Sequence, residues 1–213
     1  METNRVQLCE DIINTCLKMD TSGINQGTSG NLSVRYKNGF LITPSSMPYD
    51  EMKPEDIVEM NMDGEYVGKQ PSSEWRFHRD ILINRKDINV VLHCHPINAT
   101  AIACHNKDIP AFHYIVGLAG GKNIRCAKYA TFGTQELSDN ALIALENRMA
   151  CLLGHHGMIC LGKTFKDAFF LGCEVESMSK IYVKALAIGN TDILSDEEMD
   201  KVVKQMERMS YGK

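Results

Sequence analysis

Several common features are missing from this sequence. None of its eight cysteines forms a Cys-x-x-Cys pair, which argues against a zinc ribbon or a thioredoxin-type redox motif. No apolar run approaches the ~18 residues that a membrane-spanning helix needs, so no membrane association is expected. Positive charge is also scarce, with 23 lysines and arginines against 27 aspartates and glutamates. Because nucleic-acid-binding proteins usually present a basic face, nucleic acid is not an expected partner.

The N-terminus, Met1-Glu2-Thr3-Asn4-Arg5, lacks a basic segment leading into an apolar stretch. Without that secretory pattern we expect a cytoplasmic protein whose cysteines are reduced. The 213 residues are 44% hydrophobic and 23% charged, as in an ordinary globular protein. With no internal repeat or linker, the prediction is a single domain over residues 1–213.

The most informative segment is His93-Cys94-His95-Pro96, which follows a predicted buried strand over residues 88–92. Side chains alternate along a strand, so His93 and His95 point to the same side and can share a cation. Zinc usually takes three or four protein ligands, so two imidazoles are not sufficient. The candidates for the others are Glu74 and the pair His155-His156, of which one is expected to bind because adjacent residues face apart.

Hydroxyl and amide side chains gather at three predicted loops, over residues 25–31, 43–46 and 71–73. Glycine lets backbone N–H groups converge on an anion, and serines at a helix start lie where the helix dipole favours one. The alternatives are an ordinary turn for the first loop and simple helix capping for the last. The loop at 25–31 is neither a Walker loop nor a dinucleotide-binding fingerprint.

The remaining pattern predicts both hairpins and helices. Asn38-Gly39 and Asp63-Gly64 each separate two strand-like runs, which indicates antiparallel pairing and no βαβ alternation in the first half. Apolar residues at helical spacing predict helices over residues 3–19, 135–148 and 164–188. Further helices are expected to begin near Pro71, near Pro96 and after Ser195.

Taken together, six segments resemble the class II sugar-phosphate aldolases: residues 25–31, 71–78, 93–95, 109–114, 129–134 and 155–157. They occur in order over nearly the whole chain. The resemblance implies an α/β fold with three α/β/α layers around a central, mostly antiparallel mixed sheet. It also implies a homotetramer whose active sites lie at subunit interfaces.

The resemblance also assigns functional residues. It places one zinc ion per subunit on Glu74, His93, His95 and, of the adjacent pair, His156. Tyr114 and Tyr211 correspond to tyrosines that act in catalysis, Tyr211 from across an interface. The phosphate of the substrate falls on six residues: Gly30, Asn31, Ser45, Ser46, Ser72 and Ser73. Ser45-Ser46 stands where these aldolases often carry Thr-Gly.

The implied reaction is the reversible cleavage of a phosphorylated sugar, and the resemblance is nearest to members that act on L-fuculose 1-phosphate. The products would be dihydroxyacetone phosphate and L-lactaldehyde, formed through an enediolate with zinc as the Lewis acid. Glu74 is expected to transfer the proton at carbon, and Tyr114 to act at the C4 oxygen. The alternatives are an aldolase for rhamnulose or 5-deoxypentulose 1-phosphate, a pentulose-phosphate 4-epimerase, and a binding protein with a structural zinc site.

Overall fold

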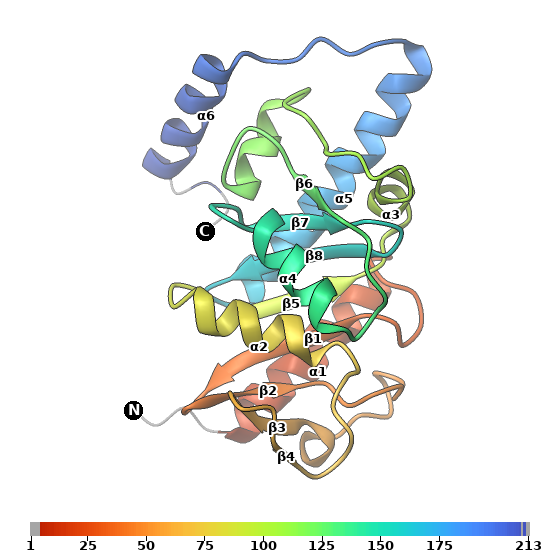
Figure 1. The fold of residues 1–213 in the computed structure, drawn as a ribbon, viewed down its shortest axis with the longest axis vertical. Helices are drawn as coiled ribbons and strands as arrows, with labels where there is room; N and C mark the ends of the chain where they lie inside the picture. The colour runs from red at the N-terminus through yellow and green to blue at the C-terminus, as the bar shows by residue number, and fades with distance from the viewer. Residues whose placement is uncertain (1–4, 210, 212–213) are drawn as a thin grey trace.

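Eight strands form one mixed sheet in the computed structural model, which describes residues 5–209 and 211 (Figure 1). The strand order is β4-β3-β2-β1-β5-β8-β7-β6. Strands β6 and β7 pair in parallel, and the other neighbouring pairs are antiparallel. The strands are β1 (Asn31–Tyr36), β2 (Gly39–Ile42), β3 (Val58–Asn61), β4 (Tyr66–Val67), β5 (Val90–Cys94), β6 (Arg125–Ala127), β7 (Ala150–Leu153) and β8 (Gly157–Gly162).

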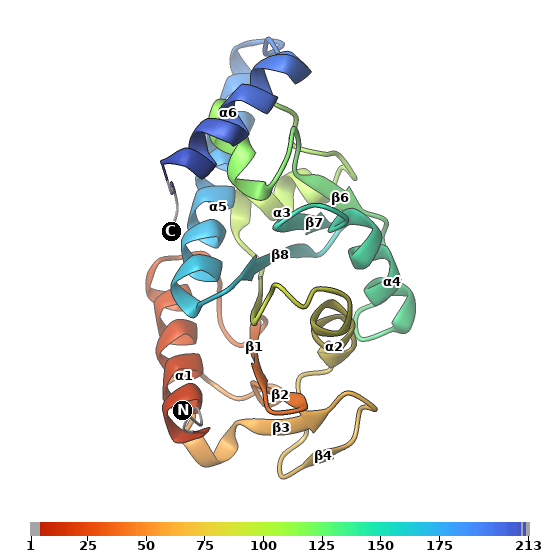
Figure 2. The same cartoon turned by 90° about the vertical axis from the view of Figure 1, so that its left-hand side faces the viewer.

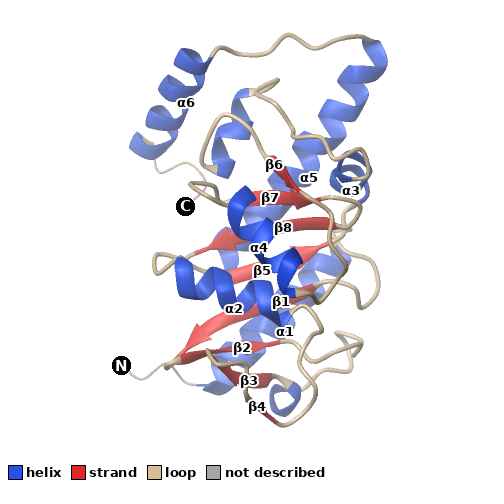
Figure 3. Cartoon of the chain, viewed as in Figure 1, coloured by secondary structure: helices blue, strands red, loops and turns tan. Residues whose placement is uncertain are grey.

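Helices cover both faces of this sheet, as Figures 2 and 3 show. One apolar core lies between the sheet and helices α1, α3 and α5, and a second lies between the opposite face and α2 and α4. The predicted three-layer α/β/α fold is therefore confirmed. The helices are α1 (Arg5–Thr21), η1 (Pro54–Asp56), α2 (Trp75–Asn84), α3 (Ile97–Ala103), η2 (Tyr114–Ala119), α4 (Gln135–Ala144), α5 (Phe165–Ile188) and α6 (Asp196–Arg208).

Strand β5 lies near the middle of the sheet and is buried along its whole length. Val90, Leu92 and Cys94 face the core beneath α1, α3 and α5, whereas Val91 faces the core beneath α2 and α4. Since side chains alternate, His93 points to the same face as Val91. The strand begins and ends two residues later than the predicted range, so His93 belongs to the strand itself.

The predicted helix starts depend on hydroxyl caps. The side chains of Thr134, Thr164 and Ser195 each accept a hydrogen bond from a backbone N–H in the first turn of the following helix. Helix α4 ends at Ala144, four residues before its predicted end, because the chain turns there and Asn147 takes a left-handed backbone with φ 54°.

The first hairpin turns at a different place from the prediction. Tyr36 pairs with Gly39, so the turn consists of Lys37 and Asn38 rather than Asn38 and Gly39. A Cβ atom on Gly39 would collide with the carbonyl group of Met60 on β3, which explains the glycine at this strand position. Residues 5–209 and 211 include no helix with the length and apolar character that crossing a lipid bilayer demands.

Candidate active site

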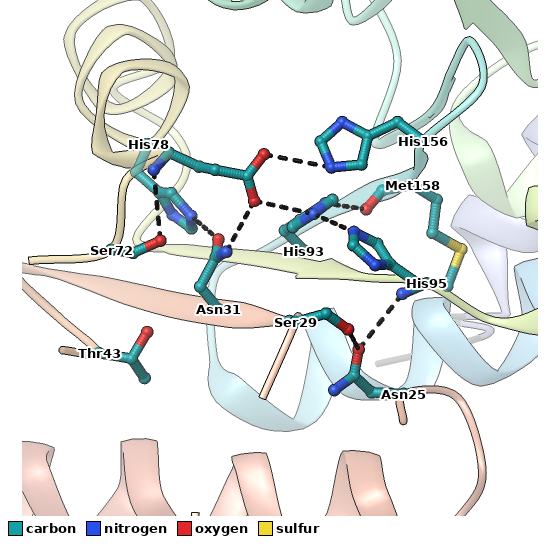
Figure 4. Close-up of polar contacts among 12 residues, drawn as sticks. Asn25, Ser29, Asn31, Thr43, Ser72, His78, His93, His95, His156 and Met158 are labelled. Atoms are coloured by element: carbon teal, nitrogen blue, oxygen red, sulfur yellow. Dashed lines mark hydrogen bonds and ion pairs between the residues drawn. The ribbon is translucent and has the colours of Figure 1, made fainter. Parts of the chain in front are cut away.

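Three histidine side chains meet beside the end of β5 (Figure 4). His93 is on β5, His95 follows it directly, and His156 lies in the turn between β7 and β8. Antiparallel pairing of β5 with β8 aligns Cys94 with Met158, which brings that turn next to His95. The ligating nitrogens of the three rings all lie within 4.8 Å of one another.

The hydrogen bonds of His93 show that this cluster fits a cation. Its Nδ1 atom donates to the carbonyl oxygen of Met158 at 2.9 Å, so in a neutral ring Nε2 carries a lone pair. That Nε2 lies 2.8 Å from His95 Nε2 and 3.1 Å from a carboxylate oxygen of Glu74. One proton at this nitrogen can bond to one of these neighbours, whereas a divalent cation can bind all three groups.

Glu74 supplies a buried carboxylate to the cluster. It immediately precedes α2, a helix that begins at Trp75 and not near Pro71 as predicted. Its Oε1 atom is 3.2 Å from His156 Nε2 but has no hydrogen bond, an unusual state for a buried oxygen that a metal would explain. Burial alone would raise the pKa of Glu74, but His93, His156 and a hydrogen bond from Asn31 hold it well below the ordinary value.

The imidazoles of His95 and His156 are in the neutral state that metal binding requires. Burial, together with the neighbouring imidazoles, lowers the pKa of His95 to about 3. Burial and the nearby His93 lower the pKa of His156 to about 4. Both rings are therefore neutral at pH 7, with a lone pair available to a cation. Among the described residues, His93, His95, His156 and Glu74 are the candidates for holding a metal ion.

Close backbone packing brings the loop at residues 25–31 against β5, the strand that carries His93. A Cβ atom on Gly30 would lie 2.9 Å from the carbonyl oxygen of His93, so this approach requires glycine. Asn25 fixes the same contact: its Oδ1 accepts from the backbone N–H of His95 at 3.3 Å, and its Nδ2 contacts the Tyr49 hydroxyl at 3.1 Å. The loop therefore helps to position His95.

A pocket of about 430 Å³ opens beside the histidine cluster. Its wall carries hydroxyl and amide groups from three separate loops, and no lysine or arginine is among the described residues that line it. Ser46 has a left-handed backbone with φ 56°, a conformation that glycine adopts more easily. All six residues expected to bind phosphate line this pocket, together with Glu74, His95 and His156: Gly30, Asn31, Ser45, Ser46, Ser72 and Ser73.

Aromatic side chains stand at the mouth of the pocket. Tyr129 and Phe132 are exposed and line it, and His155 lies edge-on to the Tyr129 ring. His155 points away from the cluster, with φ 52°, and its Nε2 is 2.8 Å from Asn106 Nδ2. Adjacent residues thus face apart at this turn, as the sequence suggested.

Tyr114 and Tyr211 are not part of this pocket in their own chain. Both line a separate pocket at α6, and their side chains are 47% and 43% exposed. Helix α6 packs against η2, the short helix that Tyr114 begins. Within one chain, the structure therefore brings together the expected metal and phosphate residues but not the two tyrosines.

Sequence analysis missed three residues that support the site. Asn25 and Tyr49 hold the glycine-rich loop, and His78 contacts Asn31. His78 fits the apolar spacing of α2 and is fully buried, so it resembles a core residue in the sequence. The one available signal was its polar ring on the buried face of a helix that begins beside Glu74.

Known proteins similar to this chain share its fold and length. A 5-methylthioribulose-1-phosphate/5-deoxyribulose-1-phosphate aldolase of Rhodospirillum rubrum is 47% identical, with 100% of this chain and 96% of that protein covered. An L-fuculose phosphate aldolase of Escherichia coli is 46% identical, with 100% and 98% covered. A solved L-fuculose 1-phosphate aldolase structure superposes with a TM-score of 0.92 at 38% identity, covering 94% of this chain and 96% of the other.

The family comparison agrees with these relatives. The family described as Class II Aldolase and Adducin N-terminal domain matches residues 10–183, which include the histidine cluster and nearly all of the sheet and its helices. The match, the full-length relatives and the fold all lead to one assignment. The chain belongs to the class II aldolase and adducin N-terminal domain family.

Proposed function

We propose that this protein is a zinc-dependent aldolase that cleaves L-fuculose 1-phosphate reversibly into dihydroxyacetone phosphate and L-lactaldehyde. The observation that carries the proposal is the convergence of Glu74 with three imidazoles at one side of a hydroxyl-lined pocket. A metal centre beside an anion pocket is what cleavage of a phosphorylated ketose requires. A structural metal site would need no such pocket.

The pocket wall is the proposed phosphate site. Ser45, Ser46, Ser72 and Ser73 bring hydroxyl groups to one wall, and Gly30 brings a backbone that packs closely against β5. Hydroxyl and backbone N–H groups are the donors that phosphate oxygens accept from. The phosphate at C1 would occupy this wall, with the reacting carbons directed toward Glu74.

Zinc, when bound by Glu74, His93, His95 and His156, supplies a Lewis acid for the carbonyl oxygen of the ketose. The side chains supply the proton transfers. In the cleavage direction, Tyr114 would take the proton of the C4 hydroxyl as the C3–C4 bond breaks and pass its own phenolic proton to solvent. Glu74 would take up one proton from solvent and deliver it to C3, so that no net proton is gained or lost. Cleavage thus needs no lysine that forms a Schiff base.

The position of Tyr114 and Tyr211 supports a proposal about assembly. Both tyrosines are half-exposed at α6, away from the pocket of their own chain. We infer that the protein is a homotetramer in which these side chains complete the pocket of a neighbouring subunit. Each active site would then lie at a subunit interface.

A second substrate is favoured by the Rhodospirillum rubrum relative, which is 47% identical and is a 5-methylthioribulose-1-phosphate/5-deoxyribulose-1-phosphate aldolase. These substrates share the phosphate, the carbonyl group and the cleaved bond with L-fuculose 1-phosphate. They differ in the aldehyde that is released, which lacks the hydroxyl group of lactaldehyde. The candidates for distinguishing them are the aromatic residues at the pocket mouth, Tyr129 and Phe132.

The test is a panel of ketose 1-phosphates assayed for free dihydroxyacetone phosphate. We expect the highest kcat/KM for L-fuculose 1-phosphate; a higher value for 5-deoxyribulose 1-phosphate would select the second substrate. An epimerase would change the sugar without releasing a three-carbon product. Exhaustive chelation should abolish cleavage and zinc should restore it, whereas full activity of metal-free protein would contradict the proposed mechanism.

A further inference from the structure

A chain of hydrogen bonds runs from the sheet to the carboxylate of Glu74. Ser33 Oγ lies 2.7 Å from His78 Nδ1, and His78 Nε2 lies 2.5 Å from Asn31 Oδ1. Asn31 Nδ2 then donates to Glu74 Oε2 at 2.9 Å. Ser33 and His78 are fully buried, and Asn31 is nearly so. Figure 4 shows Asn31 between the ring of His78 and the histidine cluster.

The ionised carboxylate of Glu74 fixes the direction of every hydrogen bond in this series. An ionised carboxylate only accepts, so Asn31 must turn its NH₂ group to Glu74 and its carbonyl oxygen to His78. His78 must therefore carry its proton on Nε2, and its Nδ1 must accept from the Ser33 hydroxyl. Burial and the nearby His93 lower the pKa of His78 to about 3, so the ring is neutral at pH 7, as this arrangement requires.

The two oxygens of Glu74 are consequently unequal. Oε2 accepts from Asn31 and lies 3.1 Å from His93 Nε2. Oε1 lies 3.2 Å from His156 Nε2 but has no hydrogen bond, although the residue is buried and lines the pocket.

We propose that His78 is a positioning residue for Glu74: by orienting the amide of Asn31 it keeps the Asn31 NH₂ group directed at Oε2 and so holds the carboxylate in place beside the histidine cluster. This inference rests on the proposed function, in which Glu74 exchanges a proton with carbon C3. No bond to His78 is made or broken in the reaction. Its contribution is to keep the amide of Asn31 from rotating, since a rotated amide would set two acceptors against each other.

The kinetic test compares His78→Leu with His78→Gln. Leucine removes the donor to Asn31, and glutamine keeps an N–H group that can reach the position of Nε2. We expect His78→Leu to lower kcat about 10- to 100-fold, the range seen when residues that orient ligands are lost. KM should change little, and His78→Gln should retain most of the activity.

The matched control is Ser179→Ala, which removes a fully buried hydroxyl that donates to the carbonyl oxygen of Val175 at 2.7 Å within α5. This variant also loses one buried hydrogen bond but should keep the wild-type kcat. The proposal is overturned if His78→Leu matches the control, or if its loss of activity lies wholly in KM. Equal losses in the leucine and glutamine variants would also overturn it.

A spectroscopic measurement on the wild-type protein does not depend on activity or on the folding of a variant. Nitrogen-15 NMR of the histidine rings should find the His78 proton on Nε2 from pH 6 to pH 8. A proton on Nδ1 would overturn the proposal directly. By contrast, wild-type protein that cleaves no ketose 1-phosphate would contradict the proposed function, and the NMR result would still test the hydrogen-bond direction.

Discussion

The histidine cluster is formed within one chain, whereas the tyrosine region at α6, which consists of Tyr114 and Tyr211, lies away from that cluster. His93 is fully buried, its ring donates to a backbone carbonyl group, and its Nε2 lies within hydrogen-bonding distance of His95 and Glu74. The ring of His156 lies edge-on to it, with the ring centroids 4.8 Å apart. Tyr114, in contrast, is 47% exposed and lines a pocket at a different place on the molecule. One chain therefore brings together the residues of the proposed metal and phosphate sites, whereas in the proposed assembly the tyrosines would act from a second chain.

The strongest test of the histidine region is Glu74→Gln. Without the carboxylate we expect proton exchange between dihydroxyacetone phosphate and solvent to fall about 10⁴-fold, the upper range for loss of a general acid or base. Proton NMR in deuterated water measures this exchange, and circular dichroism should show an unchanged fold. Exchange at the wild-type rate would remove Glu74 from the proton-transfer step.

The tyrosine region is tested by mixing two variants. Tyr114→Phe alone should lower kcat for cleavage about 10²-fold, because a phenylalanine ring cannot transfer a proton. If Tyr114 acts across an interface, subunit exchange between Tyr114→Phe and Glu74→Gln proteins creates some sites with both wild-type residues. The mixture should then be more active than either variant. No gain after confirmed exchange would place both residues in the same chain's site.

A smaller effect, on stability rather than on rate, is expected from Asp80→Asn. Asp80 joins α2 to α4 by accepting from Ser138 at 2.6 Å and from Gln135 at 2.7 Å, and it pairs with Arg79 at 2.7 Å. Losing this carboxylate should lower the free energy of unfolding by about 1–3 kcal/mol at pH 7, as measured by urea denaturation. The kcat should stay close to wild type because the helix still presents Glu74.

The pH dependence of that stability difference follows from the pKa of Asp80. Burial raises this pKa, but hydrogen bonds from Arg79, Ser138 and Gln135 outweigh burial and lower it. A lowered pKa stabilises the fold above the unfolded value, about 3.9, and this contribution is lost as the pH falls through the folded value. The gap between wild type and Asp80→Asn should therefore shrink in acid, and a gap that widens there would contradict this assignment.

The smallest expected effect concerns Ser46 in the proposed phosphate wall. Ser46→Ala and Ser46→Gly both remove the hydroxyl, so each should raise KM for the ketose 1-phosphate about three- to tenfold. They differ in the backbone, because φ is 56° at this position and glycine adopts such an angle without strain. Ser46→Gly should therefore melt at a higher temperature than Ser46→Ala. Unchanged KM in both variants would exclude the Ser46 hydroxyl from phosphate binding.

Local patterns predicted much of the fold. The alternating and helical spacings identify the strands around His93 and the long helix after Thr164, because each pattern reflects burial of one face. Turn positions were less predictable. Gly39 looks like a turn residue in the sequence, but its lack of a side chain is needed for packing against Met60 on the neighbouring strand. That contact comes from strand pairing, which local sequence does not specify.

Part of the candidate site could likewise be predicted from the sequence, and part of it could not. His93 and His95 could be paired from strand geometry alone, and the family resemblance pointed to Glu74 and His156, which the structure brings beside them. His78 could not be identified, because its buried position on α2 resembles that of the apolar residues around it. Its hydrogen bonds with Asn31 and Ser33, made between α2 and β1, distinguish it from a core residue.

The wall of the pocket has a further consequence for how substrate arrives. Its hydroxyl and amide donors carry no net charge, and no lysine or arginine is found among the described residues of the lining. Such donors attract an anion only at contact distance, whereas a cationic wall would steer it from a Debye length away, about 8–10 Å at ordinary ionic strength. At the proposed phosphate wall, these side chains would therefore add no long-range attraction for a sugar phosphate.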